Sequence, residues 1–426
     1  MSEWETKKLG EITDWFSGGT PSKQNETYWG GDIPWISAKT LKGTRVSESE
    51  TLITEEGLKS GSRLALKDDL LLLVRGSGLF NSIPISIVDK PVAFNQDIKA
   101  IRLKKEYKHI SPWFLLYWLH GNKRILNGIM EETGIGAGKF DLSLLKALTI
   151  DIPPQKELEE ITKTVKIIDD KLTLLQKQNQ TLEELAQTLF KRWFVEFEFP
   201  NENGQPYKSS VGKMVESELG EIPEGWSVRT IGDLSIEISD FVANGSFASL
   251  KENVTLYPDK EEYALFIRNT DLKSGFKDKV YVDEHSYNFL KKTKLFGGEV
   301  IISNVGDVGS VFQCPYFDFP MTLGNNVIML KSDFNNFLYL FFSGRIGQYL
   351  IKGITGGSAQ PKFNKTEFKT LEIPFPTENV LSDFEIQAES IFKKVTNNKQ
   401  EVQSLTQLRD ALLPKLMSGE LKINSN

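Results

Sequence analysis

The sequence repeats itself once, and the repeated unit has the length of a whole domain. Trp4 recurs as Trp226, and residues 9–12 recur as residues 231–234. This offset of about 222 positions is far longer than the roughly 20 to 50 residues of a solenoid repeat. Later anchors keep nearly the same offset: Thr133 and Gly134 recur as Thr355 and Gly356, Lys139 and Phe140 as Lys362 and Phe363, and Ile150 and Pro153 as Ile373 and Pro376. The offset widens between these anchors, so we expect two copies of one fold that differ in loop insertions.

Length and composition agree with two folded domains. A chain of 426 residues exceeds what one hydrophobic core usually serves. Its 39% hydrophobic residues are typical of a globular protein, and no stretch approaches the roughly 18 apolar residues of a membrane span. The charged residues 1–9 lack the apolar core of a signal peptide. The single cysteine, Cys314, excludes an internal disulfide and is expected to be packed or half-buried, so a reducing, cytoplasmic location is expected.

The net charge of -6 is unusual for a protein that binds nucleic acid alone, because such proteins usually carry a basic excess that neutralises phosphates. One basic cluster has two interpretations, a solvated strand end and helix face or a phosphate-contacting surface. It consists of Lys99, Arg102, Lys104, Lys105, Lys108, His109, Lys123 and Arg124. If DNA is the ligand, partner subunits are expected to supply much of the attraction.

The first copy is predicted to mix short strands with loops and one helix. Apolar or β-branched runs bounded by Gly, Pro, Asn and Asp predict strands at residues 33–36, 70–74, 83–88 and 98–103. Ser111 and Pro112 are suited to start a helix from residue 112 to about 126. A glycine-rich turn at 133–138 and a strand through 148–152, stopped by Pro153 and Pro154, follow. The polar residues 200–220 predict a linker or an extended excursion.

Each copy then ends in a long segment with coiled-coil periodicity. Seam residues follow one another in alternating steps of four and three, which predicts a helix that begins at Gln155 and runs to about Trp193 in the first copy. The first seam is Ile161, Val165, Ile168, Leu172, Leu175, Asn179, Leu182, Ala186 and Leu189; the second is Phe384, Ala388, Ile391, Val395, Asn398, Val402, Leu405, Arg409 and Leu412. Such a helix would be roughly 58 Å long, at about 1.5 Å per residue.

One asparagine interrupts each seam, and the two asparagines are not equivalent in the repeat. In an antiparallel pair an a position faces a d position, so the residue numbers across every layer add to one constant. Placing Asn179 opposite Asn398 also places Leu172 opposite Leu405, Leu175 opposite Val402, Leu182 opposite Val395 and Val165 opposite Leu412. We therefore expect the helices to pair antiparallel within one chain, with the asparagines hydrogen-bonded to fix the register. The alternative is that Asn398 lies on a frayed surface.

The glycine-rich run from Gly134 to Lys139 resembles a phosphate-binding loop but does not match it. Thr133 stands where that loop begins with glycine, and Phe140 stands where it needs Ser or Thr. A glycine loop, repeated at residues 356–362, is the better interpretation. It either contacts the target or simply makes a turn.

No other motif indicates catalysis. Asp259 together with residues 271–273 matches the acidic spacing of a nuclease core only weakly, because residues 40–42 of the first copy carry no acid. The histidines, His109, His120 and His285, lack the spacing of metal ligands. The chain is therefore predicted to be non-catalytic.

Polar residues that could read bases occur at matched places in the two copies. Arg, Lys, Asn, Gln, Ser and Thr can bond to base edges, although each is also a common turn or surface residue. The candidates are Ser17, Thr20, Ser22, Lys23, Arg75, Asn95, Gln96 and Lys139 in the first copy, and Arg268, Asn269, Asn304, Asn325, Asn326, Ser358, Gln360 and Lys362 in the second.

Several motifs, spread over nearly the whole chain, resemble the DNA specificity subunits of type I restriction-modification systems. They are Gly-Gly-Thr-Pro-Ser at 18–22, Ile-Asp-Ile-Pro-Pro at 150–154, Leu-Phe-Lys-Arg-Trp-Phe at 189–194, Ser-Glu-Leu-Gly-Glu-Ile-Pro-Glu-Gly-Trp at 217–226, and Leu-Arg-Asp-Ala-Leu-Leu-Pro-Lys-Leu-Met-Ser-Gly at 408–419. One departure is the start of each helix, where the family usually has Glu-Gln after the prolines. Here Gln155 and Lys156 follow Pro154, and Pro376 has no such pair after it.

The repeat and the resemblance together imply an α+β fold. Two similar mixed α/β target-recognition domains would be separated by two long antiparallel coiled-coil helices, with an internal pseudo-twofold repeat. The expected boundaries are 1–153 for target-recognition domain 1, 154–197 for the first spacer helix, 198–376 for a linker and target-recognition domain 2, and 377–426 for the second spacer helix. Each domain would read one half of a bipartite double-stranded DNA target, and the helices would set the unread spacer.

The resemblance assigns catalysis to partner subunits. Two methyltransferase subunits that bind S-adenosylmethionine would dock on the helices and flip adenines out of the duplex, and restriction subunits that bind ATP and Mg would translocate and cut DNA. The chain itself would hold no cofactor and no metal, and would not contact a membrane. Two other classes stay open: a two-headed coiled-coil scaffold or adhesion protein, and a metal-dependent DNA nuclease that uses Asp259 and Asp271.

Overall fold

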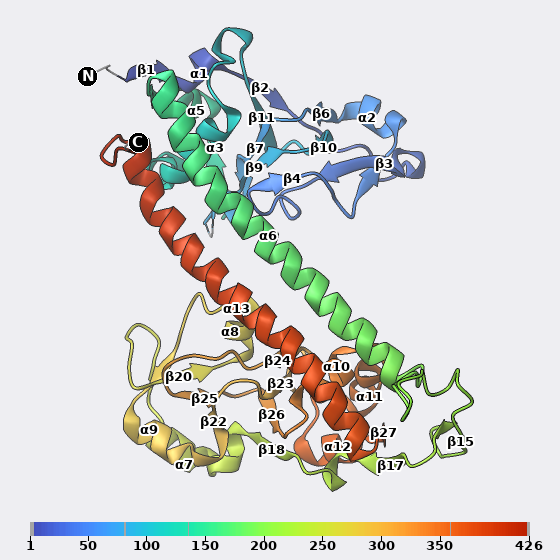
Figure 1. Cartoon of the computed structure of the whole chain (residues 1–426). Coiled ribbons are helices and arrows are strands. Elements are labelled where there is room, and N and C mark those ends of the chain that lie inside the picture. The colour runs from blue at the N-terminus through green and yellow to red at the C-terminus, as the bar shows by residue number, and fades with distance from the viewer. Residues whose placement is uncertain (1–3, 81, 135, 358, 424–426) are drawn as a thin grey trace. The chain divides into compact units, whose positions relative to one another are not determined.

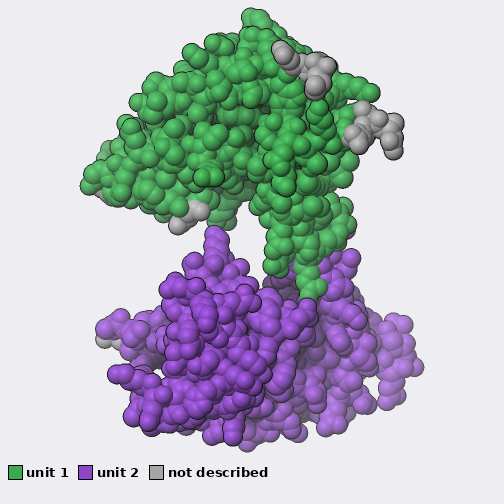
Figure 2. All heavy atoms as spheres, turned by 90° about the vertical axis from the view of Figure 1, so that its left-hand side faces the viewer, with its two compact units in different colours: residues 1–176, 400–426 green, residues 177–399 purple. Residues whose placement is uncertain are grey.

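The computed structural model describes residues 4–80, 82–134, 136–357 and 359–423. The chain forms two compact units (Figure 2): residues 1–176 with 400–426 make unit 1, and residues 177–399 make unit 2. Each unit contains one copy of the repeat and one segment of each of two long helices, which Figure 1 draws in green and red.

Unit 1 is built around a five-stranded sheet with a buried centre. β7 is a run of four leucines and β9 reads Ile-Ser-Ile-Val, and every residue of both strands is buried. The strand order is β2 (Thr13–Ser17), β11 (Ile98–Leu103), β7 (Leu70–Leu73), β9 (Ile85–Val88) and β4 (Arg45–Val46). The strands predicted at 70–74, 83–88 and 98–103 are therefore confirmed.

A four-stranded sheet contains the remaining predicted strand, residues 33–36. Its order is β5 (Leu52–Ile53), β3 (Trp29–Ile36), β10 (Val92–Phe94) and β6 (Arg63–Ala65), and β3 runs parallel to β10. Two small antiparallel sheets complete the unit. They are β12 (Met130–Glu132), β13 (Gly138–Phe140) and β8 (Arg75–Gly76), and β1 (Glu5–Lys8) with β14 (Thr149–Ile152).

The single helix predicted from residue 112 to about 126 is wrong, because two helices meet at Asn122. They are α3 (Pro112–Gly121) and α4 (Lys123–Gly128). The backbone N–H of Asn122 donates to the Trp118 carbonyl over 3.0 Å, and its side-chain Nδ2 donates to the same oxygen over 2.9 Å. An asparagine amide competes in this way with the helical pattern, so it ends α3. Pro112 occupies the first turn as expected, whereas the Ser111 side chain makes no capping bond.

The other helices of unit 1 are short. They are α1 (Leu9–Ile12), α2 (Glu55–Gly61) and α5 (Leu142–Ala147), with the 3-10 helices η1 (Glu26–Tyr28), η2 (Ser77–Phe80) and η3 (Lys105–Tyr107).

Unit 2 repeats the strand pairings of unit 1. β20 runs parallel to β25 as β3 runs parallel to β10, and β17 pairs antiparallel with β27 as β1 pairs with β14. One sheet is β18 (Glu237–Asp240), β26 (Val327–Lys331), β23 (Val300–Ser303) and β24 (Val311–Gln313); the other is β19 (Leu256–Tyr257), β21 (Tyr281–Val282), β20 (Ala264–Ile267), β25 (Met321–Leu323) and β22 (Lys294–Leu295); β17 is Ser227–Thr230 and β27 is Glu372–Phe375. The repeat is thus one fold used twice. Cys314 is buried, as expected.

Several helices of unit 2 occupy places that correspond in the repeat to helices of unit 1. α10 and α11 follow β26 as α3 and α4 follow β11. The set is α7 (Phe247–Asn253), α8 (Asn269–Ser274), α9 (Glu284–Phe289), α10 (Asn335–Ser343), α11 (Arg345–Ile354) and α12 (Lys365–Lys369), with η4 (Ile231–Asp233), η5 (Phe241–Asn244) and η6 (Lys291–Thr293).

The predicted linker at 200–220 is held by aromatic contacts. Phe199 stacks on Tyr207 and on Trp226, with ring centroids 4.6 and 5.5 Å apart. β15 (Met214–Val215) pairs with β16 (Ile222–Pro223), which lies just beyond the end of the segment. Residues 200–220 themselves are exposed or half-buried, so the aromatic contacts anchor the segment without burying it.

The two long helices, α6 (Gln155–Phe194) and α13 (Glu378–Met417), each have 40 residues. Their first and last residues are related by the offset that relates Ile150 to Ile373. In unit 1 the core includes Leu158, Ile161 and Val165 of α6 with Leu413 and Leu416 of α13. In unit 2 it includes Phe190, Trp193 and Phe194 of α6 with Phe384 and Ala388 of α13. Each helix is therefore part of both cores.

Candidate functional site

Backbone hydrogen bonds join the segments of unit 1 that contain the candidate residues. Gly19 N donates to Phe94 O over 2.9 Å, Val74 N to Asp97 O over 2.8 Å, and Phe140 N to Val74 O over 2.9 Å. The loop after β2, the turn between β10 and β11, the end of β7 and strand β13 therefore lie side by side. We call these segments the unit 1 loop cluster.

The exposed side chains of the unit 1 loop cluster are mostly polar. Thr20 Oγ1 donates to Gln96 Oε1 over 2.6 Å, and Lys99 Nζ donates to Ser17 Oγ over 2.5 Å. Burial lowers the pKa of Lys99. Ser22 and Lys23 are exposed in the loop that leads to η1.

A row of charged side chains crosses β12, β13 and β8. Lys139 lies between Arg75 on one neighbouring strand and Glu131 on the other, and all three residues are exposed. The row has one surplus positive charge. It offers two cationic donors within reach of a single anionic ligand.

Asn95 was expected to contact the target, and the structure places its side chain inward. Its side chain is buried, accepts a hydrogen bond from Asp97 N and donates to the Asp97 carboxylate, both over 3.2 Å. An asparagine that bonds two residues ahead forms an Asx turn. Asn95 therefore shapes the turn that presents Gln96.

Unit 2 assembles the corresponding segments in the same way. Gly324 N donates to Ile267 O over 2.7 Å, Asn304 N to Asn326 O over 3.1 Å, and Phe363 N to Asn304 O over 3.1 Å. Lys362 lies opposite Val305, as Lys139 lies opposite Arg75. We call the segments around Ile267, Asn304, residues 324–326 and residues 362–363 the unit 2 loop cluster.

The candidate side chains of unit 2 are of two kinds. Asn325, Asn326, Gln360 and Lys362 are exposed. Asn269 and Asn304 are half-buried and donate to Ser303 Oγ over 3.1 Å and to Phe363 O over 3.2 Å. Within the described part of the chain the Oδ1 atoms of Asn269 and Asn304 are buried and have no hydrogen-bond partner. Ser358 lies outside the described residues.

Arg268 was expected to contact the target, and part of its guanidinium is paired within unit 2. Nε and Nη2 donate to the two carboxylate oxygens of Asp271 over 2.9 and 2.6 Å, and Nη2 also donates to Asp278 O over 2.8 Å. Asp271 is buried in this pair, which also removes the carboxylate on which the nuclease alternative depended. The Arg268–Asp271 pair is structural.

Several members of the basic cluster bond to protein atoms. Arg102 makes a bidentate pair with the buried Asp69, at 2.7 Å for each bond. Lys104 Nζ donates to the carbonyls of Gly10 and Glu11 over 3.2 and 2.8 Å. A solvated face is therefore the wrong interpretation for these two residues, because they brace the sheet and α1.

The sequence reasoning missed a cluster beside Asn269. Lys273 forms an ion pair with Asp307, and Ser310 Oγ donates to Asp307 Oδ2 over 2.5 Å. The hydrogen bonds from Lys273 and Ser310 lower the pKa of Asp307. No local pattern in the sequence marks this cluster, because it joins α8 to the loop between β23 and β24.

The two helices pair antiparallel in the predicted register. Asn398 Nδ2 donates to Asn179 Oδ1 over 2.9 Å, and both asparagines are buried. Ion pairs cross between the helices on either side of this layer, Lys399 to Glu183 over 3.0 Å and Lys171 to Glu401 over 3.1 Å. Leu172, Leu175 and Val395 are buried, and Leu182, Val402 and Leu405 are half-buried. The alternative of a frayed Asn398 is wrong.

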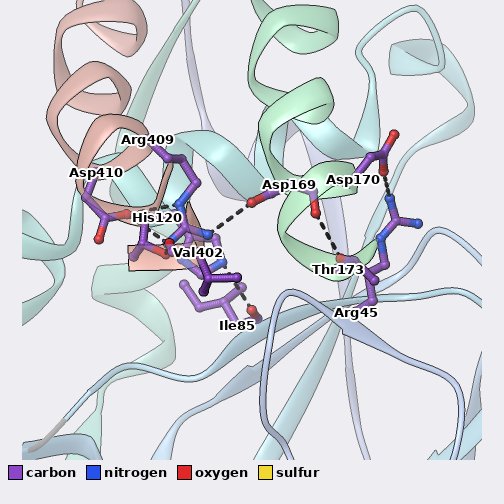
Figure 3. A network of polar contacts seen from close by, with 10 residues as sticks. Arg45, Ile85, His120, Asp169, Asp170, Thr173, Val402, Arg409 and Asp410 are labelled. Carbon is purple, nitrogen blue, oxygen red and sulfur yellow. Dashed lines mark hydrogen bonds and ion pairs between the residues drawn. The ribbon is translucent and has the colours of Figure 1, made fainter. Parts of the chain in front are cut away.

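A polar network fixes the helices to unit 1 (Figure 3). Arg409 of α13 points toward α6 and donates to Asp169 Oδ1 over 3.0 Å, while Arg45 of β4 pairs with the next residue, Asp170. Asp169 is only 2% exposed, and Arg409 is the cation that faces its buried carboxylate. His120 contacts Ile85 O in the same region, and burial lowers its pKa to about 3.

Among the residues that the structure describes, no helix combines the length and apolarity needed to cross a membrane. In those same residues, no three His, Cys, Asp or Glu side chains are grouped so that they could hold a metal ion.

Two copies of one α/β fold, each with the same loop cluster and each sharing a pair of antiparallel helices, define a duplicated recognition protein. The model of the type I restriction modification DNA specificity domain matches residues 1–184 and 223–408. The chain therefore belongs to the family of DNA specificity subunits of type I restriction-modification systems.

Individual relatives agree with this assignment. The type I restriction enzyme MjaIX specificity subunit of Methanocaldococcus jannaschii is 29% identical, over 99% of this chain and 94% of the relative. The EcoR124I/EcoR124II specificity subunit of Escherichia coli is 33% identical over 39% of this chain and 40% of its own length. The crystal structure of the S subunit from M. genitalium shares the fold, with a TM-score of 0.56 at 14% identity over 99% of this chain and 97% of that chain.

Proposed function

We propose that each copy of the repeat reads one half of a bipartite double-stranded DNA target, and that α6 and α13 dock two methyltransferase subunits and the restriction subunits. The matched loop clusters of the two units support this proposal. Ser17, Thr20, Ser22, Lys23, Gln96, Arg75 and Lys139 in unit 1, and Asn325, Asn326, Gln360 and Lys362 in unit 2, are its DNA-contacting residues.

One observation supports the proposal: the same position of the repeat has an exposed lysine in each unit. Lys139 and Lys362 are equivalent in the repeat, and each lies opposite the segment that follows the central strand, at Arg75 and at Val305. Recurrence in two separate copies favours a ligand over a turn requirement, since a turn does not need an exposed cation. Phosphate contacts position a protein on DNA, and contacts to base edges supply sequence preference.

The overall charge indicates that the chain does not act on DNA alone. With a net charge of -6, long-range attraction to phosphates has to come from basic partner subunits. S-adenosylmethionine, ATP and Mg belong to those partners in this proposal, and the specificity subunit supplies sequence recognition.

Domain exchange tests the proposal. Residues 1–150 are replaced by the equivalent domain of another specificity subunit, and the methylated sites of the host DNA are mapped by sequencing. Only one half of the methylated motif should change, because the second copy is untouched. The reciprocal exchange of residues 223–372 is the matched control and should change only the other half. A change in both halves, or in neither, from either exchange contradicts the proposal.

A further inference from the structure

The repeat relates each polar layer of the helix pair to an apolar layer, and not to a second polar layer. The offset that relates Gln155 to Glu378 places Leu175 at the position equivalent to Asn398, and Val402 at the position equivalent to Asn179. The asparagine layer of the pair thus corresponds to the apolar layer Leu175 opposite Val402. In the paired helices the two asparagines lie in one layer and share one hydrogen bond, from Asn398 Nδ2 to Asn179 Oδ1.

The buried ion pair has the same asymmetry. The repeat places Phe392 at the position equivalent to Asp169, and Ala186 at the position equivalent to Arg409. Phe392 and Ala186 are both buried in the core of unit 2. The Asp169–Arg409 pair therefore also has an apolar counterpart elsewhere along the helices.

A pair of identical helices would misplace all of these groups. Two copies of α6 in the equivalent register would set Asn179 against Leu175 and Asp169 against Ala186, twice each. Two copies of α13 would set Asn398 against Val402 and Arg409 against Phe392. Buried amides and charges without partners disfavour a packing strongly, and one buried asparagine can determine which helices associate.

We propose that Asn179, Asn398, Asp169 and Arg409 make each long helix selective for the helix of the other repeat and against a second copy of itself. The partner of α6 is thereby the non-identical helix α13, so the two copies of the repeat associate as a mixed pair and not as like pairs. This selectivity is independent of DNA binding.

Like pairing can be imitated inside the intact chain. The double variant Asn398→Leu with Val402→Asn gives α13 the residues that α6 has at these layers, so that Asn179 faces a leucine and Leu175 faces an asparagine. The double variant Leu175→Asn with Asn179→Val does the reverse on α6. We expect each double variant to raise the unfolding equilibrium constant by about a hundredfold, at roughly tenfold for each orphaned amide.

Combining all four substitutions restores two matched layers. A valine then faces a leucine where the two asparagines stood, and two asparagines face each other in the layer that Leu175 and Val402 formed. The combined variant should unfold at nearly the same urea concentration as the wild type, followed by the loss of helical circular dichroism. Val395→Leu is the matched control, because it imitates like pairing at an apolar layer, and it should change the midpoint little.

The test remains decisive even if a double variant does not fold. The combined variant contains all four substitutions, so its recovery would show that no single substitution is itself incompatible with folding. Recovery in the combined variant supports selectivity through matched polar layers. Failure of the combined variant to recover, or double variants no less stable than Val395→Leu, would overturn the proposal.

Discussion

At the scale of single residues, some candidate side chains are exposed on the loop clusters, and others form hydrogen bonds within their own unit. Arg75, Gln96, Lys139 and Lys362 are exposed on the loop clusters, whereas Asn95 and Arg268 are bonded inward. The bracing of Asn95 could have been read from its spacing to Asp97, which is typical of an Asx turn. That of Arg268 could have been read from Asp271, three residues later.

Removal of the Arg409 side chain should destabilise unit 1 substantially. Arg409→Ala leaves the charge of Asp169 buried without a partner, and breaking such a pair costs about 3 kcal/mol or more. Lys399→Ala is the control, since it breaks the exposed pair with Glu183 and should cost under about 1 kcal/mol. Urea denaturation measures both changes. Equal losses would show that the charge of Asp169 does not need Arg409.

At the scale of elements, periodicity was a better guide than local composition. The antiparallel register of α6 and α13 followed from seam positions alone, because heptads report which residues face a partner. The break between α3 and α4 at Asn122 could not be predicted from periodicity. It depends on a hydrogen bond from the Asn122 side-chain amide to the Trp118 carbonyl. Asp169 was missed because it lies one position beyond the seam residue Ile168. The packing at 199–226 was missed because its aromatic residues meet only in three dimensions.

One contact between elements should make stability depend on pH. Glu385 of α13 accepts hydrogen bonds from Phe337 N over 2.7 Å and from Asn336 Nδ2 over 2.9 Å at the start of α10. Burial raises the pKa of Glu385 from 4.5 to about 7. A raised carboxyl pKa means that the folded state holds the proton more tightly than the unfolded state. The contribution of Glu385 is therefore complete below pH 4.5 and lost as the pH rises through about 7.

The unfolding free energy of unit 2 should accordingly fall across that window with a slope from this group of up to about 1.4 kcal/mol per pH unit. Glu385→Gln cannot ionise and should flatten the profile, measured by urea denaturation at about pH 5 and about pH 7.5. Asp383→Asn, an exposed position on the same helix, should leave the profile unchanged. A profile that Glu385→Gln does not alter would show that Glu385 is not the responsible group.

At the scale of the whole molecule, the duplication organises both the fold and its candidate sites. The anchors of the repeat fall on equivalent strands, helices and loops, so two clusters could be located from one sequence pattern. The base preference of the proposed DNA contacts did not follow, because such a preference depends on donors and acceptors of loops whose lengths differ between the copies.

The duplication predicts equivalent effects from Lys139 and Lys362. Lys139→Ala, assembled with the methyltransferase, should weaken binding to a duplex that contains the mapped target and lower the salt dependence by about one phosphate contact. The affinity for every base variant of the target should fall by a similar factor, because a phosphate contact carries no base preference, and Lys362→Ala should have the same effect through unit 2. Fluorescence anisotropy over a salt series measures both. Lys105→Ala, exposed outside the loop clusters, is the control, and an equal loss there would place the DNA contacts elsewhere.

The loop clusters and the helix seam share no residue. Substitutions in the loops can therefore accumulate without altering the layers that let α6 and α13 find each other. Under the proposed function, mutation or exchange of a domain-length segment would change one half of the target and leave the helix pairing intact. A new target would then be reached by a single exchange, because the residues that pair the helices lie outside the exchanged segment.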